Sequence, residues 1–187
     1  MSVGPDVLEE LVQRVREAAP RLGRTRLVLI DGPSGSGKTT LADQLAEALP
    51  AQVVHMDDLY DGWNGMLAGV DRVGAQVLEP LADGHDGRYQ RYDWYAGDYA
   101  EWHDVPRAPY LVVEGCGSGA RRFGELTALL VWVEAPDDER LARTLARDGE
   151  GAEEHLRAWM AAERVVYETE GTAQRADVRL DGRGAIT

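Results

Sequence analysis

The apolar residues of this chain fall into two repeating patterns. Short apolar runs, each closed by charged or turn residues, predict buried strands over 27–31, 52–56, 110–114, 129–133 and 176–180. Apolar residues at helical spacing predict helices over 5–19, 41–49, 70–81, 139–148 and 152–169. Strands that alternate with helices indicate an α/β fold, so we expect three layers with a mainly parallel five-stranded sheet and helices on both faces.

Composition limits the classes of protein to consider. With 187 residues, the chain is expected to form one domain over 1–187, in which 85–105 is a substrate-side insertion and 137–150 a lid region. A net charge of −13 argues against nucleic acid or a membrane as the main partner. No apolar run approaches a membrane span, and a single cysteine, Cys116, is typical of a reducing cytoplasm.

A glycine-rich stretch between the first predicted strand and its helix carries the clearest chemical signal. It reads Gly32-Pro33-Ser34-Gly35-Ser36-Gly37-Lys38-Thr39, followed by Thr40, and meets the spacing Gly-x4-Gly-Lys-Thr of a phosphate-binding loop. Glycines allow backbone N–H groups to approach a polyphosphate, and the helix N-terminus adds unpaired donors. Lys38 would then contact the β- and γ-phosphates, and the Thr39 hydroxyl would ligate Mg²⁺. The stretch therefore predicts ATP or GTP binding rather than a purely structural turn.

Acidic residues follow two of the predicted strands. Asp57 and Asp58 come after 52–56, and Glu114 ends 110–114. Ligands of open parallel sheets bind beyond the carboxyl ends of the strands, so Asp57 is expected to face the γ-phosphate or its acceptor and Glu114 the Mg²⁺ side. The alternative is that these acids only cap loops.

Three arginines of the predicted helix 139–148 share one face. Arg140, Arg143 and Arg147 stand at positions i, i+3 and i+7, as expected for a clamp that closes over reacting phosphates. The alternative is a solvated face paired with Glu139 and Asp148.

Segment 85–105 is rich in aromatic residues interspersed with arginine and aspartate. Such side chains can stack on a flat ring and hydrogen-bond its edges, which favours a substrate-side role. Trp63 and Met66 in the preceding loop are further candidates for acceptor contacts, with packing in the core as an equal alternative for both. The alternative is a half-exposed aromatic hairpin that packs on the sheet.

Several stretches together resemble the uridine kinase family, which is similar to the phosphoribulokinase and bacterial pantothenate kinase group. The matching pieces, in family order, are 32–40, Met56-Asp57-Asp58-Leu59-Tyr60, Tyr92-Asp93-Trp94, Val112-Val113-Glu114-Gly115, the arginines of 140–148 and Ala176-Asp177-Val178. The chain departs from the family pattern at Leu59 and Thr144, and its segment between Tyr60 and Val70 is shorter.

The resemblance implies transfer of the ATP γ-phosphoryl group to a hydroxyl, with ATP and Mg²⁺ as cofactors. It implies that Asp57 orients and deprotonates the acceptor, that Lys38, Arg140 and Arg143 assist catalysis, and that Arg147 belongs to the nucleotide side. The acceptor would be bound by Asp58, Tyr60, Arg91, Tyr92 and Asp93, and would be a nucleoside, a sugar or a pantetheine-like compound.

Two other functions remain open at this point. A nucleotide-binding switch or ATPase without a small-molecule acceptor would use 85–105 as a protein-binding surface. A nucleoside monophosphate kinase would need basic residues for the acceptor phosphate, and Arg88 and Arg91 are candidates. The sequence leaves the oligomeric state open.

Overall fold

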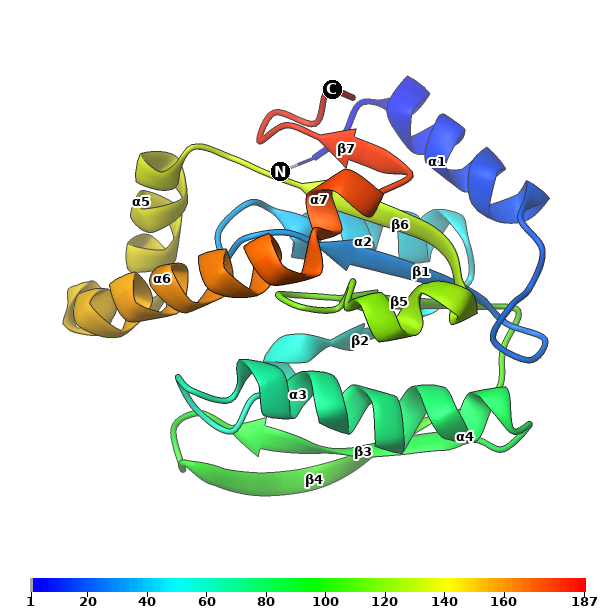
Figure 1. Ribbon diagram of the computed structural model, residues 1–187, viewed down its shortest axis with the longest axis horizontal. Coiled ribbons are helices and arrows are strands. Elements are labelled where there is room, and N and C mark those ends of the chain that lie inside the picture. The colour runs from blue at the N-terminus through cyan, green and yellow to red at the C-terminus, as the bar shows by residue number, and fades with distance from the viewer. Residues whose placement is uncertain (1) are drawn as a thin grey trace.

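The computed structural model describes residues 2–187 and is built around a five-stranded parallel sheet (Figure 1). The strand order is β2 (Gln52–His55), β5 (Tyr110–Glu114), β1 (Arg26–Asp31), β6 (Thr127–Val133) and β7 (Val178–Leu180). All four neighbouring pairs are parallel, which confirms the expected α/β class and sheet. The carboxyl ends of the strands therefore lie along one edge, as a ligand site in such a sheet requires.

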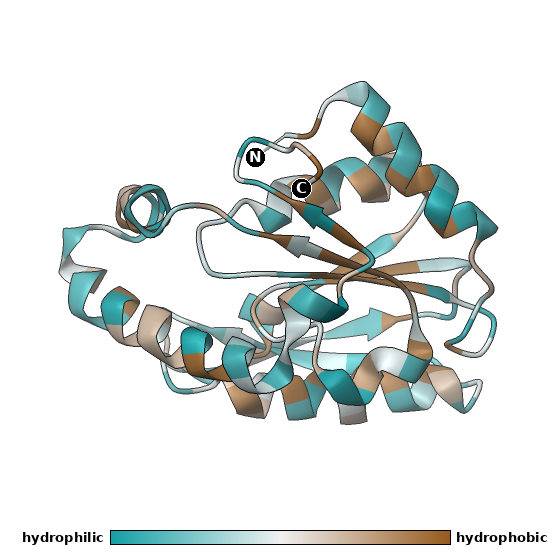
Figure 2. Ribbon diagram, turned by 45° about the horizontal axis from the view of Figure 1, so that its top comes forward, coloured by the Kyte–Doolittle hydropathy of each residue, from teal (hydrophilic) through white to brown (hydrophobic). Residues whose placement is uncertain are grey.

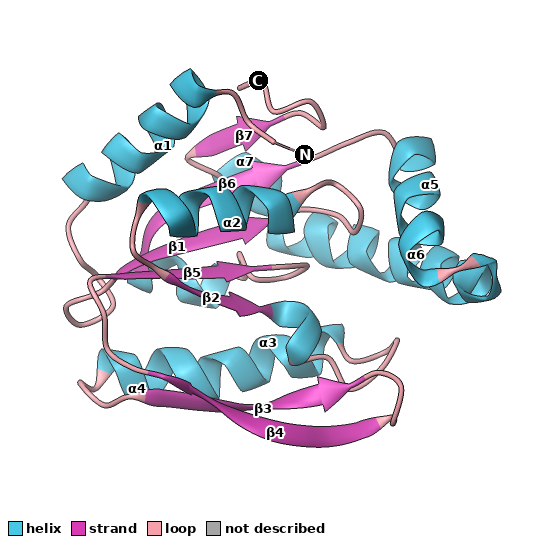
Figure 3. Ribbon diagram, turned by 180° about the vertical axis from the view of Figure 1, so that it is seen from behind, coloured by secondary structure: helices cyan, strands magenta, loops and turns pink. Residues whose placement is uncertain are grey.

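Helices cover both faces of this sheet. On one face, α1 (Pro5–Glu17) and α2 (Lys38–Ala48) pack on a buried cluster that includes Val28, Ile30 and Val131 (Figure 3). Alternate residues of the same strands, such as Leu27, Leu29 and Leu130, belong to the core of the opposite face. Side chains of a strand point alternately to its two sides, so the continuous apolar runs reflect burial on both faces (Figure 2).

A helical stretch begins earlier than the sequence pattern predicted. It consists of α3 (Met66–Val73), a π-helical segment η2 (Gly74–Leu78) and α4 (Glu79–Ala82), whereas the prediction began at Val70. Met66 is buried and precedes Val70 by four residues, so it extends the same apolar stripe by one turn. Met66 is therefore a core residue, as the packing alternative proposed.

Segment 85–105 forms an antiparallel hairpin of β3 (Gly87–Asp93) and β4 (Asp98–Val105), separate from the main sheet (Figure 3). Tyr89 and Val105 pack into the main core, whereas Tyr95 and Trp102 are exposed. The segment is thus a partly exposed aromatic hairpin, as the alternative expected. Its residues Tyr92, Trp94 and Tyr95 line the cavity in front of the phosphate loop, so the substrate-side role stays a prediction.

Two helices project beyond the carboxyl ends of the strands (Figure 1). These are α5 (Asp137–Asp148) and the first turns of α6 (Glu153–Glu170), joined by Gly149 and the short 3₁₀ helix η4 (Glu150–Ala152). Further short helices are η1 (Met56–Asp58), η3 (Arg121–Leu126) and α7 (Thr172–Arg175). None of the helices within residues 2–187 combines the length and hydropathy needed to cross a bilayer.

Candidate active site

The phosphate loop joins β1 to α2 in a conformation that requires its glycines. Gly35 and Gly37 have φ angles of 77° and 104°, in the region that L side chains rarely adopt. A Cβ at Gly35 would lie 2.6 Å from the carbonyl oxygen of Arg140, and one at Gly32 would overlap the carbonyl oxygen of Val133. The first-turn N–H groups of α2 have no partners inside the helix, so the loop presents a cradle of donors that fits a polyphosphate.

Buried acids hold this loop from behind. The Asp31 carboxylate accepts hydrogen bonds from the backbone N–H groups of Gly32, Gly117 and Gly119, at 2.7, 2.9 and 2.9 Å. It thereby ties the end of β1 to the loop that follows β5. Burial raises the pKa of Asp31, although the surrounding N–H donors and Lys38 act in the opposite direction.

Helix α6 supplies a second set of contacts behind the loop. Glu163 accepts a hydrogen bond from the Ser34 N–H at 2.8 Å, and the Tyr167 hydroxyl donates to the Gly32 carbonyl at 2.7 Å. Arg140 donates to Glu163 at 2.7 Å and to the Ser34 carbonyl at 2.9 Å. These contacts hold the loop in place from the side of α5 and α6.

Arg140 does not face the cavity in front of the phosphate loop, although the helical spacing predicted that it would. Its side chain is 4% exposed, is bound by Glu163 and Asp137, and does not line the cavity in front of the phosphate loop. The expectation of a catalytic clamp residue facing the reacting phosphates is corrected by this geometry, because the residue supports the loop from behind. Arg143 and Arg147, farther along α5, line the cavity, and they also pair with Glu139 at 2.8 Å and with Asp148 at 2.7 Å, as the alternative expected.

Lys38 lies at the floor of that cavity. Its Nζ donates to the Pro33 carbonyl at 3.0 Å. Burial alone would lower the pKa of Lys38, but negative groups around it, Glu114 and Glu163 among them, raise it overall. The ammonium group therefore remains charged and available to a phosphate.

Thr39 and Glu114 form the part of the site that suits Mg²⁺. The Thr39 hydroxyl donates to Glu114 Oε1 at 3.1 Å, and His55 Nδ1 lies 2.7 Å from the same oxygen. This hydrogen bond raises the pKa of His55. Residues 2–187 contain no cluster of three or more acidic, histidine or cysteine side chains arranged for a metal. Mg²⁺ in nucleotide sites commonly takes only one or two protein oxygens besides phosphates and water, so Thr39 and Glu114 fit it.

Asp57 faces the same cavity from η1. Its Oδ2 lies 4.0 Å from a guanidinium nitrogen of Arg147, and both side chains are more than half exposed. Enclosure by the cavity walls raises the pKa of Asp57, and the negative charge of Glu114 raises it further. Arg147 and Lys38 lower the same pKa. Solvent still reaches the carboxylate, so these opposing effects are moderated by screening.

The cavity has a volume of about 740 Å³, which suits a nucleotide together with a small second substrate. It collects most of the residues that the sequence proposed as a site: Ser34, Gly35, Gly37, Lys38, Thr39, Thr40, Asp57, Asp58, Tyr60, Arg91, Tyr92, Glu114, Arg143 and Arg147. Gly32, Ser36, Asp93 and Arg140 are not among its lining residues.

Aromatic rings close the cavity on the side away from α2. Trp63 lies edge-on to Trp94 with ring centroids 5.2 Å apart, and stacks on His155 with an interplanar angle of 8°. The Trp94 indole N–H donates to the Asp57 carbonyl at 2.9 Å, which joins the hairpin turn to η1. Tyr60 is almost fully buried, and its hydroxyl donates to the Cys116 carbonyl at 2.7 Å.

Two residues proposed for the acceptor are engaged within the hairpin. Asp93 accepts hydrogen bonds from the N–H groups of Tyr95 and Ala96, both at 2.9 Å, and so caps the turn. Arg91 lines the cavity but pairs with Glu101 at 2.6 Å and with Asp93 at 3.3 Å. For Asp93 the geometry shows a structural role in the hairpin turn, and a direct acceptor contact stays a prediction.

Sequence reasoning missed Glu163 and Tyr167 as supports of the loop. A signal was present, because Leu156, Trp159, Glu163 and Tyr167 recur at helical spacing and place an acid on a buried stripe. The sequence linked Cys116 only to a reducing compartment. In the structure it lies in the cavity wall, where burial raises its pKa to about 12 and keeps the thiol protonated.

Comparisons with known proteins agree with this architecture. A family model described as an AAA domain matches residues 28–158, which is more than half of the chain. A structure described as a possible uridine kinase from Bacillus stearothermophilus is 23% identical, covers 93% of this chain and 97% of its own, and has a TM-score of 0.67. A candidate fructose transport system kinase from Silicibacter sp. TM1040 is 25% identical, covers 87% of this chain and 94% of its own, and has a TM-score of 0.62. A search of curated proteins finds no match.

Proposed function

The chain belongs to the AAA domain family, and we propose that it is a phosphotransferase that moves the γ-phosphoryl group of ATP to a hydroxyl of a small molecule. One observation carries this proposal. Asp57, whose side chain is more than half exposed, shares a cavity with Lys38, Thr39 and Arg147. A site that only hydrolyses or holds a nucleotide has no need of an aromatic-walled space next to such an acid.

The chemistry follows from positioning and charge. Phosphoryl transfer passes through a loose transition state, so the protein has mainly to align the two oxygens and neutralise charge on the transferred group. Lys38 and the N-terminus of α2 hold the phosphates, and Arg143 and Arg147 approach from α5. Mg²⁺, held with ATP beside Thr39 and Glu114, would offset negative charge on the phosphates.

Asp57 acts on the acceptor. Its carboxylate accepts a hydrogen bond from the attacking hydroxyl, aims one oxygen lone pair at the γ-phosphorus and takes the proton late in the transfer. The raised pKa of Asp57 makes its carboxylate a better proton acceptor than an ordinary aspartate.

The acceptor is best sought among nucleosides and sugars. Trp63, Tyr92 and Trp94 offer ring faces and edges on which a nucleobase can stack or the apolar face of a sugar can pack. The names of the two similar structures point to the same two classes. The site offers fewer free cations to an acceptor that already carries a phosphate. Arg91 is paired with acids, and Arg88 lies over the Trp102 ring near Asp104.

The partners and the compartment that we propose rest on composition. The net charge of −13 argues against nucleic acid or an anionic membrane as substrate, and one buried cysteine suits the cytoplasm.

The test is acceptor-dependent release of ADP from ATP and Mg²⁺ in the presence of pooled nucleosides and sugars. We expect Asp57→Asn to lower transfer by at least 100-fold with ATP binding retained, since only the acceptor contact is lost. Asp83→Asn, which changes an exposed acid distant from the cavity, should leave transfer unchanged. ADP release that ignores every acceptor would instead favour the nucleotide-binding switch or ATPase.

A further inference from the structure

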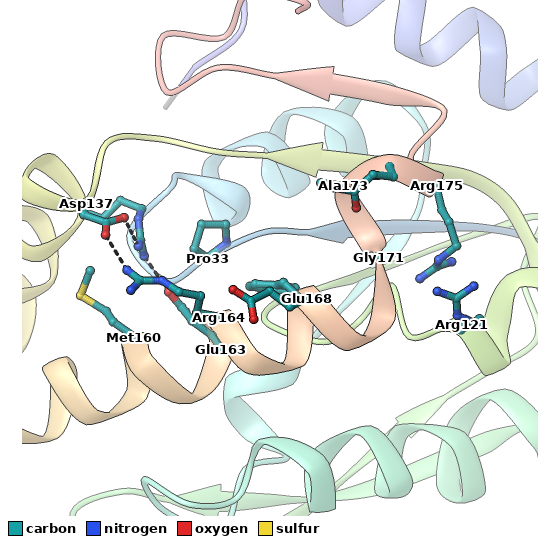
Figure 4. Close-up of a pocket in the computed structure, with 13 residues that line it drawn as sticks. Pro33, Arg121, Asp137, Met160, Glu163, Arg164, Glu168, Gly171, Ala173 and Arg175 are labelled. Carbon is teal, nitrogen blue, oxygen red and sulfur yellow. Dashed lines mark hydrogen bonds and ion pairs between the residues drawn. The ribbon is translucent and has the colours of Figure 1, made fainter.

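A second cavity lies behind the phosphate loop, on the side of α6 and α7. It has a volume of about 770 Å³, similar to that of the cavity in front of the loop. Pro33 of the loop, residues of α6 and the start of η3 surround it (Figure 4).

One end of this cavity is cationic. Arg121, at the start of η3, and Arg175, at the end of α7, place their guanidinium groups next to each other (Figure 4). Both donate to the Glu170 carbonyl, at 2.7 and 3.1 Å, and Arg175 also donates to the Gly119 carbonyl at 2.6 Å. Among residues 2–187, no carboxylate oxygen lies within 4.0 Å of either guanidinium, although acids outnumber bases by 33 to 20 in the whole chain.

The charges around this pair leave room for an anion. Burial and the neighbouring Arg121 lower the pKa of Arg175, whereas Glu170 and Asp31 act in the opposite direction. Glu170 directs one oxygen to the backbone N–H of Arg121 instead of to its guanidinium, and Glu168 lines the middle of the cavity. Two adjacent guanidinium groups repel each other, and a carboxylate or phosphate between them would relieve that repulsion with charge-assisted hydrogen bonds.

The other end of the cavity is formed by the supports of the phosphate loop. Glu163 and Tyr167, which bond to Ser34 and Gly32, both line it, and so does Arg140. A molecule that fills the cavity would therefore touch the side chains that set the position of the loop, without entering the space in front of Lys38.

We propose that this cavity binds a small organic anion, with its carboxylate or phosphate group between Arg121 and Arg175, and that occupancy changes the affinity of the phosphate loop for ATP. The volume accommodates a metabolite of about nucleotide size. Coupling between the two sites runs through Glu163 and Tyr167, and it must be reciprocal because it is a difference in binding free energy.

Binding is tested by calorimetry on the whole chain, with the phosphate loop first saturated by Mg²⁺ and a non-hydrolysable ATP analogue. Citrate serves as the carboxylate probe and glycerol 3-phosphate as the phosphate probe, so the two arms separate the two kinds of anion. We expect saturable binding of at least one probe at one molecule per chain, weakened about tenfold or more in Arg121→Ala, which loses charge-assisted hydrogen bonds. Arg24→Ala, an exposed arginine at the opposite end of β1, is the matched control and should bind as the wild type does.

Coupling is tested by measuring the affinity for the ATP analogue with and without the probe that binds. The wild type and Arg24→Ala should show a change, and Arg121→Ala should show none. If the Arg121→Ala protein does not fold, Arg121→Gln is used in both tests instead, because glutamine retains a donor for the Glu170 carbonyl. Absence of binding by both probes, equal binding by the wild type and the Arg121 variants, or binding that leaves the affinity of the wild type for the ATP analogue unchanged would overturn the proposal.

Discussion

Asp57 and Arg147 meet across the mouth of the front cavity, with Oδ2 of the acid 4.0 Å from a nitrogen of the guanidinium. One belongs to η1 at the end of β2, and the other to the last turn of α5. Both are more than half exposed, so the pair adds little to the stability of the fold. Its consequence is chemical, because the arginine lowers the pKa of the acid, against burial and Glu114, which raise it.

Arg147→Ala should move the acidic limb of the pH–rate profile to higher pH. Transfer needs ionised Asp57, so the rate falls as pH drops through its pKa, and Arg147 lowers that pKa. Removal of the guanidinium should also reduce the maximal rate by roughly 100-fold, as expected for loss of one cation that stabilises transferring charge. Steady-state rates between pH 4 and about 9 would show both effects. Arg147→Lys keeps the charge and should keep the position of the limb; an identical shift in both variants would contradict this account.

Thr39→Val should raise the Mg²⁺ concentration needed for half-maximal activity by roughly tenfold, because the substitution removes a hydroxyl beside Glu114 with little change of shape. Thr39→Ser retains the hydroxyl and is the control. A Mg²⁺ titration of ADP formation measures the difference. If valine and serine respond alike, the hydroxyl is not part of the metal site.

Glu163→Gln should lower the free energy of unfolding by about 3 kcal/mol, because the buried Arg140 loses its fully buried counter-ion. Affinity for ATP should fall as well, since the Ser34 N–H loses a charged acceptor. Urea unfolding measures the first effect, and equilibrium binding of an ATP analogue the second. Glu168→Gln, an exposed acid on the same helix, should change the stability by no more than about 0.5 kcal/mol.

The β3–β4 hairpin should loosen in acid before the main sheet unfolds. Hydrogen bonds from Arg91 lower the pKa of Glu101 to about 2, and N–H groups in the turn lower that of Asp93. A carboxylate whose pKa is lower in the folded state stabilises that state above its unfolded pKa, and the contribution is lost as pH falls through the folded value. Fluorescence of Trp94 and Trp102 should therefore change as pH falls below 4.5 toward 2, ahead of the loss of helical circular dichroism. Glu101→Gln should shift this change toward neutral pH.

The sequence predicted the sheet, its helices and the front of the site, for a physical reason. Strands buried on both faces have continuous apolar runs, and parallel strands bring Asp57 and Glu114 to one edge next to the phosphate loop. The start of α3 was placed too late because a single buried residue, Met66, carries its first turn.

The role of Arg140 could not be predicted from helical spacing. Arg140 and Arg147 do share a face, but seven residues separate them along α5, or about 10 Å of helix. Over that length the helix leaves the core, so the first arginine is buried against Glu163 and the second faces the cavity. Spacing predicts the direction in which a side chain points around the helix axis, whereas the depth to which that side chain is buried depends on tertiary packing. The second cavity could not be predicted either, because only tertiary packing brings together Arg121 and Arg175, which are distant in sequence.

The contacts of Arg140 also determine where this end of the molecule can bend. Its guanidinium joins the Ser34 carbonyl, Glu163 and Asp137, so the base of α5 is anchored to the phosphate loop and to α6. A hinge at that point would break the anchor and distort the nucleotide cradle. The break at Gly149, whose φ of 88° suits glycine and whose Cβ position is open, has no such restraint. Bending at this end of the molecule is therefore expected at Gly149, between α5 and η4, and not at the base of α5, which the Arg140 contacts hold against the phosphate loop.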